Sequence, residues 1–448
     1  MSAAFFPPYP PRGPGPVAPW RGFFGERGRT AVYGWSEQAF RRWHITRDVF
    51  GHRIHIPLHP DCVQRVLLDN SANYHKPGLV KRILMPTIGN GLLTSDGELW
   101  RSQRKIVAAS FSPPAVDSLV PVFAAVAFQA SKGWAEGRRD MAAEATGATM
   151  RVISAALFSG DPRLTSSEAT AQITAALESV TEARFQVLVG LPLIPFTVRG
   201  LRGRAAQRYL RRVLGEVVRE RLEGDSPEDF TAQMARSLLD RFPRDEAIEL
   251  AIDNAITFYL AGHETTANAI AWTLFVLGNL PDLQDEAASE AKAAIAGGVG
   301  PDLPDRLPLL RAIVEETLRL YPPAPRFDRE AVEPDRLGEA AIGPGDIVSI
   351  WPWLIHRHEK LWDEPDLFDH RRFLGEDRKH RHRFQYIPFG GGPRTCVGGR
   401  FAMVEALTIL AHWLADWRFA PTPGHQVEVS GMVTLRPKGG LPLILSRA

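Results

Sequence analysis

Apolar residues recur at helical spacing along most of the chain and alternate like a strand only over short stretches. The longest helical pattern runs from Asp245 to Leu280, and an amphipathic one covers Leu307 to Leu320. Residues Val116 to about Asp240 also have helical spacing, whereas His52–Pro57 and Asp346–Ile350 alternate. Because one face recurs about every 3.6 residues in a helix and every two in a strand, the pattern predicts mainly helices with a smaller β region.

The N-terminal stretch, residues 1–34, is rich in proline, glycine and aromatic side chains. Within it, Tyr9–Pro19 is typical of an extended proline-rich arm. The stretch contains no apolar run like that of a signal peptide, and the chain has no run of about 18 or more apolar residues. We therefore expect a soluble, cytoplasmic protein without a transmembrane helix.

Composition narrows the class of partner. The chain has 448 residues, is 44% hydrophobic and has a net charge of +2, which is too small to indicate a nucleic-acid partner. Its two cysteines, Cys62 and Cys396, lie far apart in the sequence. This spacing argues against a disulfide framework and favours a reducing compartment.

Cys396 lies in the most unusual stretch of the chain, Phe389–Ala402. A glycine run precedes the cysteine, a glycine pair follows it, and an apolar helical pattern begins at Phe401. A helix N-terminus favours negative charge, so a thiol placed there is suited to bind a metal as the thiolate. A lone cysteine is as often a small buried hydrophobic residue, and the composition alone leaves both interpretations open.

The spacing Phe389-x-x-Gly392-x-Arg394-x-Cys396-x-Gly398 resembles the haem-binding loop of the cytochrome P450 family. The resemblance implies that Cys396 is the axial thiolate ligand of the iron of haem b. It also implies that Phe389 shields the sulfur, Arg394 pairs with a haem propionate and Gly398 leaves room beside the macrocycle. The glycines 390–392 let the backbone adopt positive φ and approach the cofactor closely.

A second segment, residues 90–104, contains Trp100 and Arg104 four positions apart on one predicted helix face, with Ser95 as the expected N-cap. Such a pair can be an arginine stem lying over a surface tryptophan. The resemblance instead implies that both donate hydrogen bonds to haem propionates. It places Leu92 and Leu93 beside the substrate cavity.

The middle of the longest helical pattern reads Ala261-Gly-His-Glu-Thr-Thr266. A metalloprotease His-Glu-x-x-His site is excluded because position 267 is alanine. Gly262 and Thr265 weaken or bend a helix, which suits a helix that must leave room for a small ligand. The resemblance assigns Ala261 and Gly262 to a dioxygen groove. It assigns Glu264 and Thr265 to an acid–alcohol pair that delivers protons.

Glu316 and Arg319 lie three residues apart on the helix at 307–320. In the family this spacing forms a buried triad with a later arginine, here Arg372. The usual proline and glutamate before that arginine are replaced by His370 and Arg371. We expect the triad to hold the haem loop, and the loss of one member to be costly.

Several further residues follow from the resemblance. Arg329 is the expected propionate partner, with Arg326 as its rival. Phe327 and Met432 are expected to line an apolar substrate cavity with Leu92 and Leu93, which favours fatty acids, terpenoids or other lipophilic molecules. The apolar run Val187–Phe196 is either a buried loop or an entrance lid.

A basic run covers residues 378–383 just before the haem loop. It is either solvated surface or, with Arg101 and Lys105, the docking face for an acidic electron donor. The chain contains no flavin or iron–sulfur region, so electrons are expected from a ferredoxin or flavodoxin with its NAD(P)H reductase.

Together the motifs predict one cytochrome P450 monooxygenase domain over residues 35–448, preceded by the arm at 1–34, and a monomeric protein. The expected reaction inserts one oxygen atom of dioxygen into a lipophilic substrate, most simply as a hydroxylation. Two other functions stay open: a peroxygenase that uses hydrogen peroxide, and a non-catalytic haem sensor. The peroxygenases lack the acid–alcohol pair, and a sensor does not need one.

Overall fold

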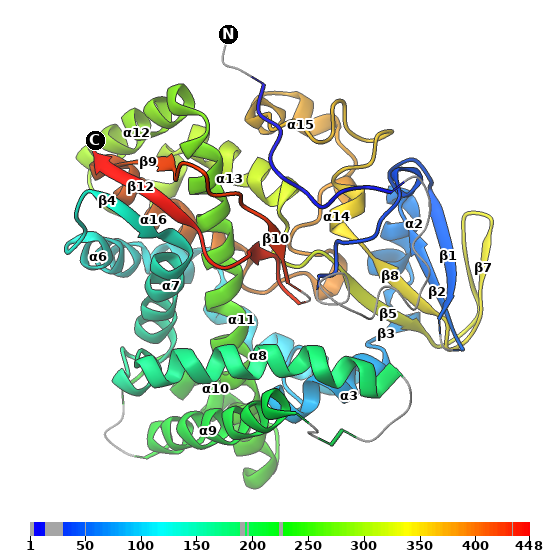
Figure 1. Ribbon diagram of the computed structural model, residues 1–448. Helices are drawn as coiled ribbons and strands as arrows, with labels where there is room; N and C mark the ends of the chain where they lie inside the picture. The colour runs from blue at the N-terminus through cyan, green and yellow to red at the C-terminus, as the bar shows by residue number, and fades with distance from the viewer. Residues whose placement is uncertain are drawn as a thin grey trace. The chain divides into compact units, whose positions relative to one another are not determined.

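The longest element is helix α11, Arg244–Gly278, drawn in green in Figure 1. The computed structural model describes residues 4–13, 30–49, 51–188, 193–194, 197–223, 227–431 and 433–448. Helix α11 is buried around nearly its whole circumference, as expected of a helix in the core of a large protein. It ends at Gly278, and Pro281 begins helix α12, close to the predicted end of the helical pattern.

The chain divides into two compact units. Unit 1 comprises Met1–Tyr74, Val116–Ala148 and Glu264–Ala448, and unit 2 comprises His75–Ala115 and Thr149–His263. Helix α11 runs continuously from one unit into the other, so Glu264 is the first residue of the last segment of unit 1.

Unit 2 is helical. Helices α8 and α9 pack along each other, and their close approach depends on Gly203, where a Cβ atom would lie 2.2 Å from the Cβ of Ser179. In the same unit, Phe230 packs edge to face against both Phe111 and Phe258, whose own rings are tilted against each other. The helices are α3 (Gly78–Ile88), α4 (Gly97–Ala108), α8 (Ser167–Leu188), α9 (Val198–Arg221) and α10 (Phe230–Leu239), with the end of α7 (Met141–Leu157) and the first part of α11.

The helices of unit 1 pack around α16, Gly399–Asp416, which contacts α6, α12 and α13. The core between them is aromatic: Trp134 packs against Trp413, and Trp272 stacks on Tyr321 with ring centroids 4.0 Å apart. The remaining helices are α2 (Pro60–Gln64), α5 (Pro113–Asp117), α6 (Val120–Ser131), α12 (Pro281–Ala296), α13 (Pro308–Leu320), α14 (Pro352–Ile355) and α15 (Asp377–His380).

The main sheet of unit 1 has the strand order β1-β2-β8-β5-β3. Strands β2 and β8 are parallel, with Ile54 opposite Ile347, and β5 is antiparallel to β8, with Phe327 opposite Ile350. A three-stranded sheet β4-β12-β9 and the hairpins β6-β7 and β10-β11 complete the described β structure. The strands are β1 (His44–Val49), β2 (His52–Pro57), β3 (Tyr74–His75), β4 (Gly137–Asp140), β5 (Phe327–Ala331), β6 (Asp335–Leu337), β7 (Ala340–Ile342), β8 (Ile347–Ile350), β9 (Trp417–Pro421), β10 (Val429–Ser430), β11 (Arg436–Pro437) and β12 (Pro442–Arg447).

The structure bears on two further expectations, the extended N-terminal arm and the absence of a transmembrane helix. The described part of the arm, residues 4–13, packs on unit 1, where Tyr321 donates to the carbonyl of Pro8 (2.7 Å) and Phe368 to that of Phe5 (3.0 Å). One stretch, Pro113–Ser131, is long and apolar enough to cross a membrane by length and composition alone, a test that the core helix of a soluble protein also passes. It is divided into α5 and α6 and contains Asp117, whose carboxylate pairs with Arg400 at 2.7 Å.

Candidate functional site

The loop before α16 presents the thiol of Cys396. The backbone N–H of Cys396 donates to the carbonyl of Phe389 (2.8 Å), and the Thr395 hydroxyl reaches the same carbonyl (3.3 Å). Gly398 is the N-cap of α16, so the cysteine lies just before the positive end of an 18-residue helix. Cys396 is exposed, whereas Cys62 is half-buried and burial raises its thiol pKa. Position and accessibility therefore single out Cys396 as the thiol that can bind a ligand.

Glycine is required where this loop is seated on unit 1. Gly392 has φ of +67°, and a Cβ atom there would lie 1.7 Å from the carbonyl oxygen of Leu67. Gly390 also has positive φ, +71°, but a Cβ atom there would meet only the ring of Phe327, at 3.8 Å. The loop thus depends on Gly392 for a close backbone approach and on Gly390 for conformation alone.

A buried histidine supports the segment leading into the loop. The backbone N–H of Ile387 donates to His356 Nε2 (2.9 Å), so Nδ1 carries the proton and donates to the carbonyl of Arg319 (3.2 Å). Burial lowers the pKa of His356 well below its usual value, which keeps the ring neutral. The sequence analysis missed His356; its one signal is that this histidine directly follows the apolar run Trp351–Ile355.

The three triad residues come together in unit 1. Arg319 and Glu316 are both fully buried and form two contacts of 2.7 Å, and Arg372 Nε lies 3.6 Å from Glu316 Oε1. Glu316 also accepts the backbone N–H of Asp369 (2.8 Å), and Arg319 donates to the carbonyl of His356 (2.7 Å). The ion pair is therefore hydrogen-bonded on both sides, as a buried pair must be.

The basic run at 378–383 is less solvated than the sequence indicated. Arg378 forms a two-point ion pair with Glu315, at 2.9 and 3.0 Å. Arg381 lies over the rings of Trp362 and Phe373, and burial lowers its pKa. Lys379 and Arg383 are exposed. Arg381 is thus a packing residue, which removes it from any docking face.

Behind the cysteine loop lies a hollow of about 260 Å³. It is lined by Arg383 and by residues of the loop itself, including Phe389, Gly391 and Thr395. The hollow places one exposed cation beside the loop that presents Cys396.

Strand β5 carries the predicted propionate partner. Arg329 is 5% exposed and donates to the carbonyl of Asp328 (3.0 Å), with its guanidinium over the Phe327 ring. Its rival, Arg326, lies 3.5 Å from the Asp328 carboxylate and over Trp351. Met432 and most of the run Val187–Phe196 lie outside the described residues.

In unit 2, α11 makes a close contact at Gly262, where a Cβ atom would lie 2.6 Å from Cδ1 of Ile153. The hydroxyl of Thr149 donates to the carbonyl of His263 (2.9 Å), and His263 Nδ1 contacts the carbonyl of Tyr259 (2.8 Å). The helix assignment continues through this segment, and the carbonyl of His263 is bonded to a side chain of α7. Ala261 is exposed.

In unit 1, the next turn of α11 carries Glu264 and Thr265, both half-buried. Glu264 Oε1 accepts a hydrogen bond from the hydroxyl of Thr434 (2.7 Å) and lies 3.9 Å from Nη1 of Arg436. The sequence analysis did not foresee these partners, which no local pattern links to α11.

Trp100 and Arg104 lie half-buried on α4 in unit 2. The N-cap of α4 is Asp96, not Ser95 as predicted, because Ser95 is buried and accepts a hydrogen bond from Gln103 (3.2 Å).

The loop before α4 is held by two α11 side chains that the sequence analysis missed. Asp253 accepts the backbone N–H of Asn90 (2.7 Å), and Asn254 accepts that of Leu92 (2.9 Å). Leu92 is half-buried and Leu93 is 41% exposed, so the second leucine is available to a ligand.

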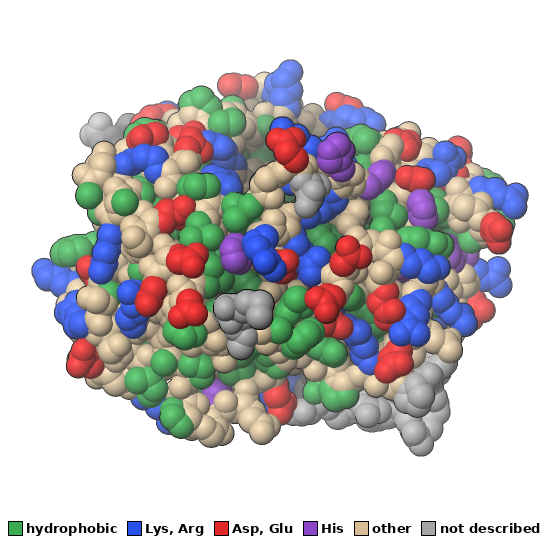
Figure 2. All heavy atoms as spheres, turned by 90° about the horizontal axis from the view of Figure 1, so that it is seen from above, with side chains coloured by type: hydrophobic (Ala, Val, Ile, Leu, Met, Phe, Trp, Pro, Cys, Tyr) green, Lys and Arg blue, Asp and Glu red, His purple; other side chains and the backbone are tan. Residues whose placement is uncertain are grey.

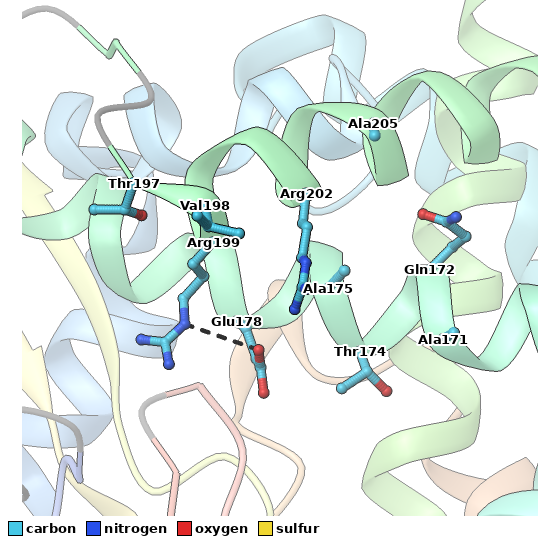
Figure 3. Close-up of a pocket in the computed structure, with 10 residues that line it drawn as sticks. All are labelled: Ala171, Gln172, Thr174, Ala175, Glu178, Thr197, Val198, Arg199, Arg202 and Ala205. Atoms are coloured by element: carbon cyan, nitrogen blue, oxygen red, sulfur yellow. Dashed lines mark ion pairs between the residues drawn. The ribbon is translucent and has the colours of Figure 1, made fainter.

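A wide groove of about 1000 Å³ lies between α8 and α9 (Figure 3). Glu178 and Arg199 face each other across it, 3.8 Å apart. None of its lining residues belongs to the predicted chemistry, so the groove is separate from the candidate site.

Comparison with known proteins decides the family. The model of the family described as cytochrome P450 matches residues 40–442. The chain belongs to the cytochrome P450 family. It is 33% identical to cyclooctatin synthase of Streptomyces melanosporofaciens over 85% of this chain and 84% of that protein. It is 28% identical to cyclooctat-9-en-7-ol 5-monooxygenase of the same organism, over 83% and 81%. The crystal structure of the P450DA heme domain has a TM-score of 0.82 at 22% identity, with 98% of each chain covered.

This P450 is a haem-dependent oxidoreductase that incorporates oxygen, with haem b as its cofactor. The residues of unit 1 fit that cofactor. Cys396 offers an exposed thiol just before a helix N-terminus, and Gly392 lets its loop pack closely against the backbone at Leu67. Arg329 adds a buried cation. The predicted fold class, mainly α with a smaller β region, is confirmed.

Proposed function

We propose that this P450 inserts one oxygen atom of dioxygen into a lipophilic organic substrate, as a hydroxylase fed by a separate ferredoxin or flavodoxin and its NAD(P)H reductase. The observation that carries the proposal is the pair Glu264–Thr265 on α11, with the acid hydrogen-bonded rather than buried alone. A carboxylate next to a hydroxyl is suited to pass protons. A peroxygenase or a haem sensor has no need of it.

In this proposal the residues have distinct roles. Cys396 binds the haem iron, with Phe389 beside the sulfur and Gly398 leaving room at the start of α16. Arg394, Arg329, Trp100 and Arg104 bind the propionates. Bound haem supplies the oxygen chemistry.

The other proposed residues bind dioxygen and substrate or support the loop. Ala261 and Gly262 border dioxygen, while Leu92, Leu93, Phe327 and Met432 contact substrate. Glu316, Arg319 and Arg372 hold the haem loop.

The proposed substrate is a largely hydrocarbon molecule. One relative supports this class, because its name describes a monooxygenase acting on cyclooctat-9-en-7-ol, a cyclic alcohol. The exposed side chain of Leu93 agrees with an apolar cavity. We further propose that the protein acts as a monomer in the cytoplasm, where its two cysteines stay reduced.

The test is proton delivery in the holoenzyme, measured without a substrate. A ferredoxin, its reductase and NADPH reduce the enzyme, and dioxygen leaves either as hydrogen peroxide, with two electrons, or as water, with four. Thr265→Ala should raise the ratio of peroxide to water by up to about a hundredfold, the low end of what a positioned proton donor contributes. The strongly red-shifted Soret band of the reduced carbon monoxide complex should stay unchanged.

Two outcomes would overturn the proposal. An unchanged peroxide share in Thr265→Ala and Glu264→Gln would remove the acid–alcohol pair from the mechanism. Absence of the red-shifted band in the wild-type protein would exclude thiolate ligation by Cys396.

A further inference from the structure

The carboxylate of Glu264 is held by a hairpin from near the C-terminus. Its Oε1 accepts the Thr434 hydroxyl at 2.7 Å and lies 3.9 Å from the Arg436 guanidinium. The side chain of Glu264 is 14% exposed and that of Arg436 is 44% exposed. A half-buried acid is thus connected to the protein surface by two polar side chains of a single turn.

This turn is fixed in place. Gly431 has φ of +124°, and a Cβ atom there would lie 1.8 Å from the carbonyl oxygen of Thr434, so the turn closes only with glycine. Leu435, between the two polar residues, is fully buried, and its N–H donates to the carbonyl of Pro323 (2.9 Å). The indole N–H of Trp272 reaches the carbonyl of Leu435 (3.5 Å). Because Leu435 is anchored, its neighbours Thr434 and Arg436 are held at α11.

We propose that Thr434 and Arg436 are positioning residues for proton delivery, and that protons enter from solvent on the side of the β10–β11 hairpin. A hydroxyl can donate and accept at once. Thr434 gives its proton to Glu264 Oε1 while its oxygen takes one from a hydronium ion of the solvent, which becomes water. Glu264 passes the proton on to the Thr265 hydroxyl, which releases its own proton on the inner side. One proton moves inward and no group is oxidised or reduced.

Arg436 acts on Glu264 when the carboxyl group is deprotonated. After Glu264 has released its proton, the guanidinium stabilises the carboxylate at a distance where a partly exposed charge pair still interacts. This inference rests on the proposed function of Glu264 and Thr265, and it names the route by which that pair is supplied.

The test compares Thr434→Val, which loses the hydroxyl, with Thr434→Ser, which keeps it, in the substrate-free oxidase assay of the holoenzyme. Thr434→Val should raise the peroxide share by about twofold to tenfold, the effect of one lost hydrogen bond, and should enlarge the solvent deuterium isotope effect. Thr434→Ser should behave like wild type. Arg436→Gln should also raise the peroxide share, and it keeps the test valid if Thr434→Val folds poorly.

Lys438→Gln is the matched control, because Lys438 follows on the same hairpin and pairs with Glu428 at the surface (2.9 Å). It should change neither readout. If Thr434→Val and Arg436→Gln lowered only thermal stability and left peroxide share and isotope effect at wild-type values, the hairpin would be merely structural. If those variants left the peroxide share unchanged while Thr265→Ala still raised it, only the route would be wrong. If Thr265→Ala also left the peroxide share unchanged, the proposed function would be wrong as well.

Discussion

At the scale of single residues, burial decides which titratable groups carry charge. Glu405 on α16 is fully buried, and burial raises its pKa well above the usual value, an effect that the hydroxyl of Thr266 offsets in part. The pKa of His356 is shifted in the opposite direction, because burial lowers the pKa of a base. Both side chains are therefore neutral near pH 7.

The neutral carboxyl of Glu405 predicts a specific pH dependence. A raised pKa in the folded state gives stability that is complete below the unfolded pKa of about 4.5 and is lost as pH rises. Glu405→Gln removes this loss, so the variant should gain on wild type by up to about 1.4 kcal/mol per pH unit above that value. Thermal unfolding of both holoproteins at about pH 5, 6.5 and 8 measures the difference in their unfolding free energies. A gap that does not widen with pH would contradict a neutral Glu405.

At the scale of elements, the cysteine loop is fixed by contacts with segments that precede it in the sequence. Gly392 presses on the turn at Arg65–Asp69, and the triad residue Arg319 is linked through His356 to Ile387. The thiol can therefore be presented at the surface while its backbone is rigid. Such rigidity is what a metal ligand needs from the loop that carries it.

The two loop glycines give a matched pair of variants. Gly392→Ala adds both strain at positive φ and a clash with the Leu67 carbonyl, whereas Gly390→Ala adds strain alone. We expect Gly390→Ala to cost about 1–2 kcal/mol of unfolding free energy. Gly392→Ala should cost more and should reduce the haem bound per protein. Haem content from the Soret-to-protein absorbance ratio, with thermal unfolding, measures both effects. Equal losses in the two variants would contradict the close approach at Leu67.

At the scale of the whole molecule, acidic and basic side chains are interspersed on the face shown in Figure 2. The net charge is only +2, so long-range steering of a charged partner has to come from local groups. In the basic run, Arg378 is paired with Glu315 and Arg381 packs on aromatic rings. Arg383 lines the hollow behind the cysteine loop. We therefore choose Arg383 to test the predicted docking of an electron donor.

Charge reversal at Arg383 tests this docking face. Arg383→Glu should slow reduction by an acidic ferredoxin by about tenfold at low salt, and the difference should shrink as salt screens the interaction. Stopped-flow reduction under carbon monoxide measures the rate. Lys292→Glu, at an exposed position on α12, is the control and should have little effect. Equal rates for wild type and Arg383→Glu at all salt concentrations would move the docking face elsewhere.

The sequence by itself determined the features that depend on neighbouring residues. The helical period of α11, the glycine-rich spacing around Cys396 and the pair at Glu316 and Arg319 are local, because a period, a turn or an i, i+3 contact is encoded within a few positions. These local features were enough to predict the fold class and the family.

Only the tertiary structure decided the contacts between distant segments. Thr434 and Glu264 are 170 positions apart, and no pattern in the sequence pairs them. The N-cap of α4 is Asp96 rather than the predicted Ser95, whose hydroxyl accepts a hydrogen bond from Gln103. Arg381 changed from a solvated charge to a packing residue because two aromatic rings lie beneath it. In each case packing selected one partner among several that local chemistry allowed, and that selection depends on the folded chain as a whole.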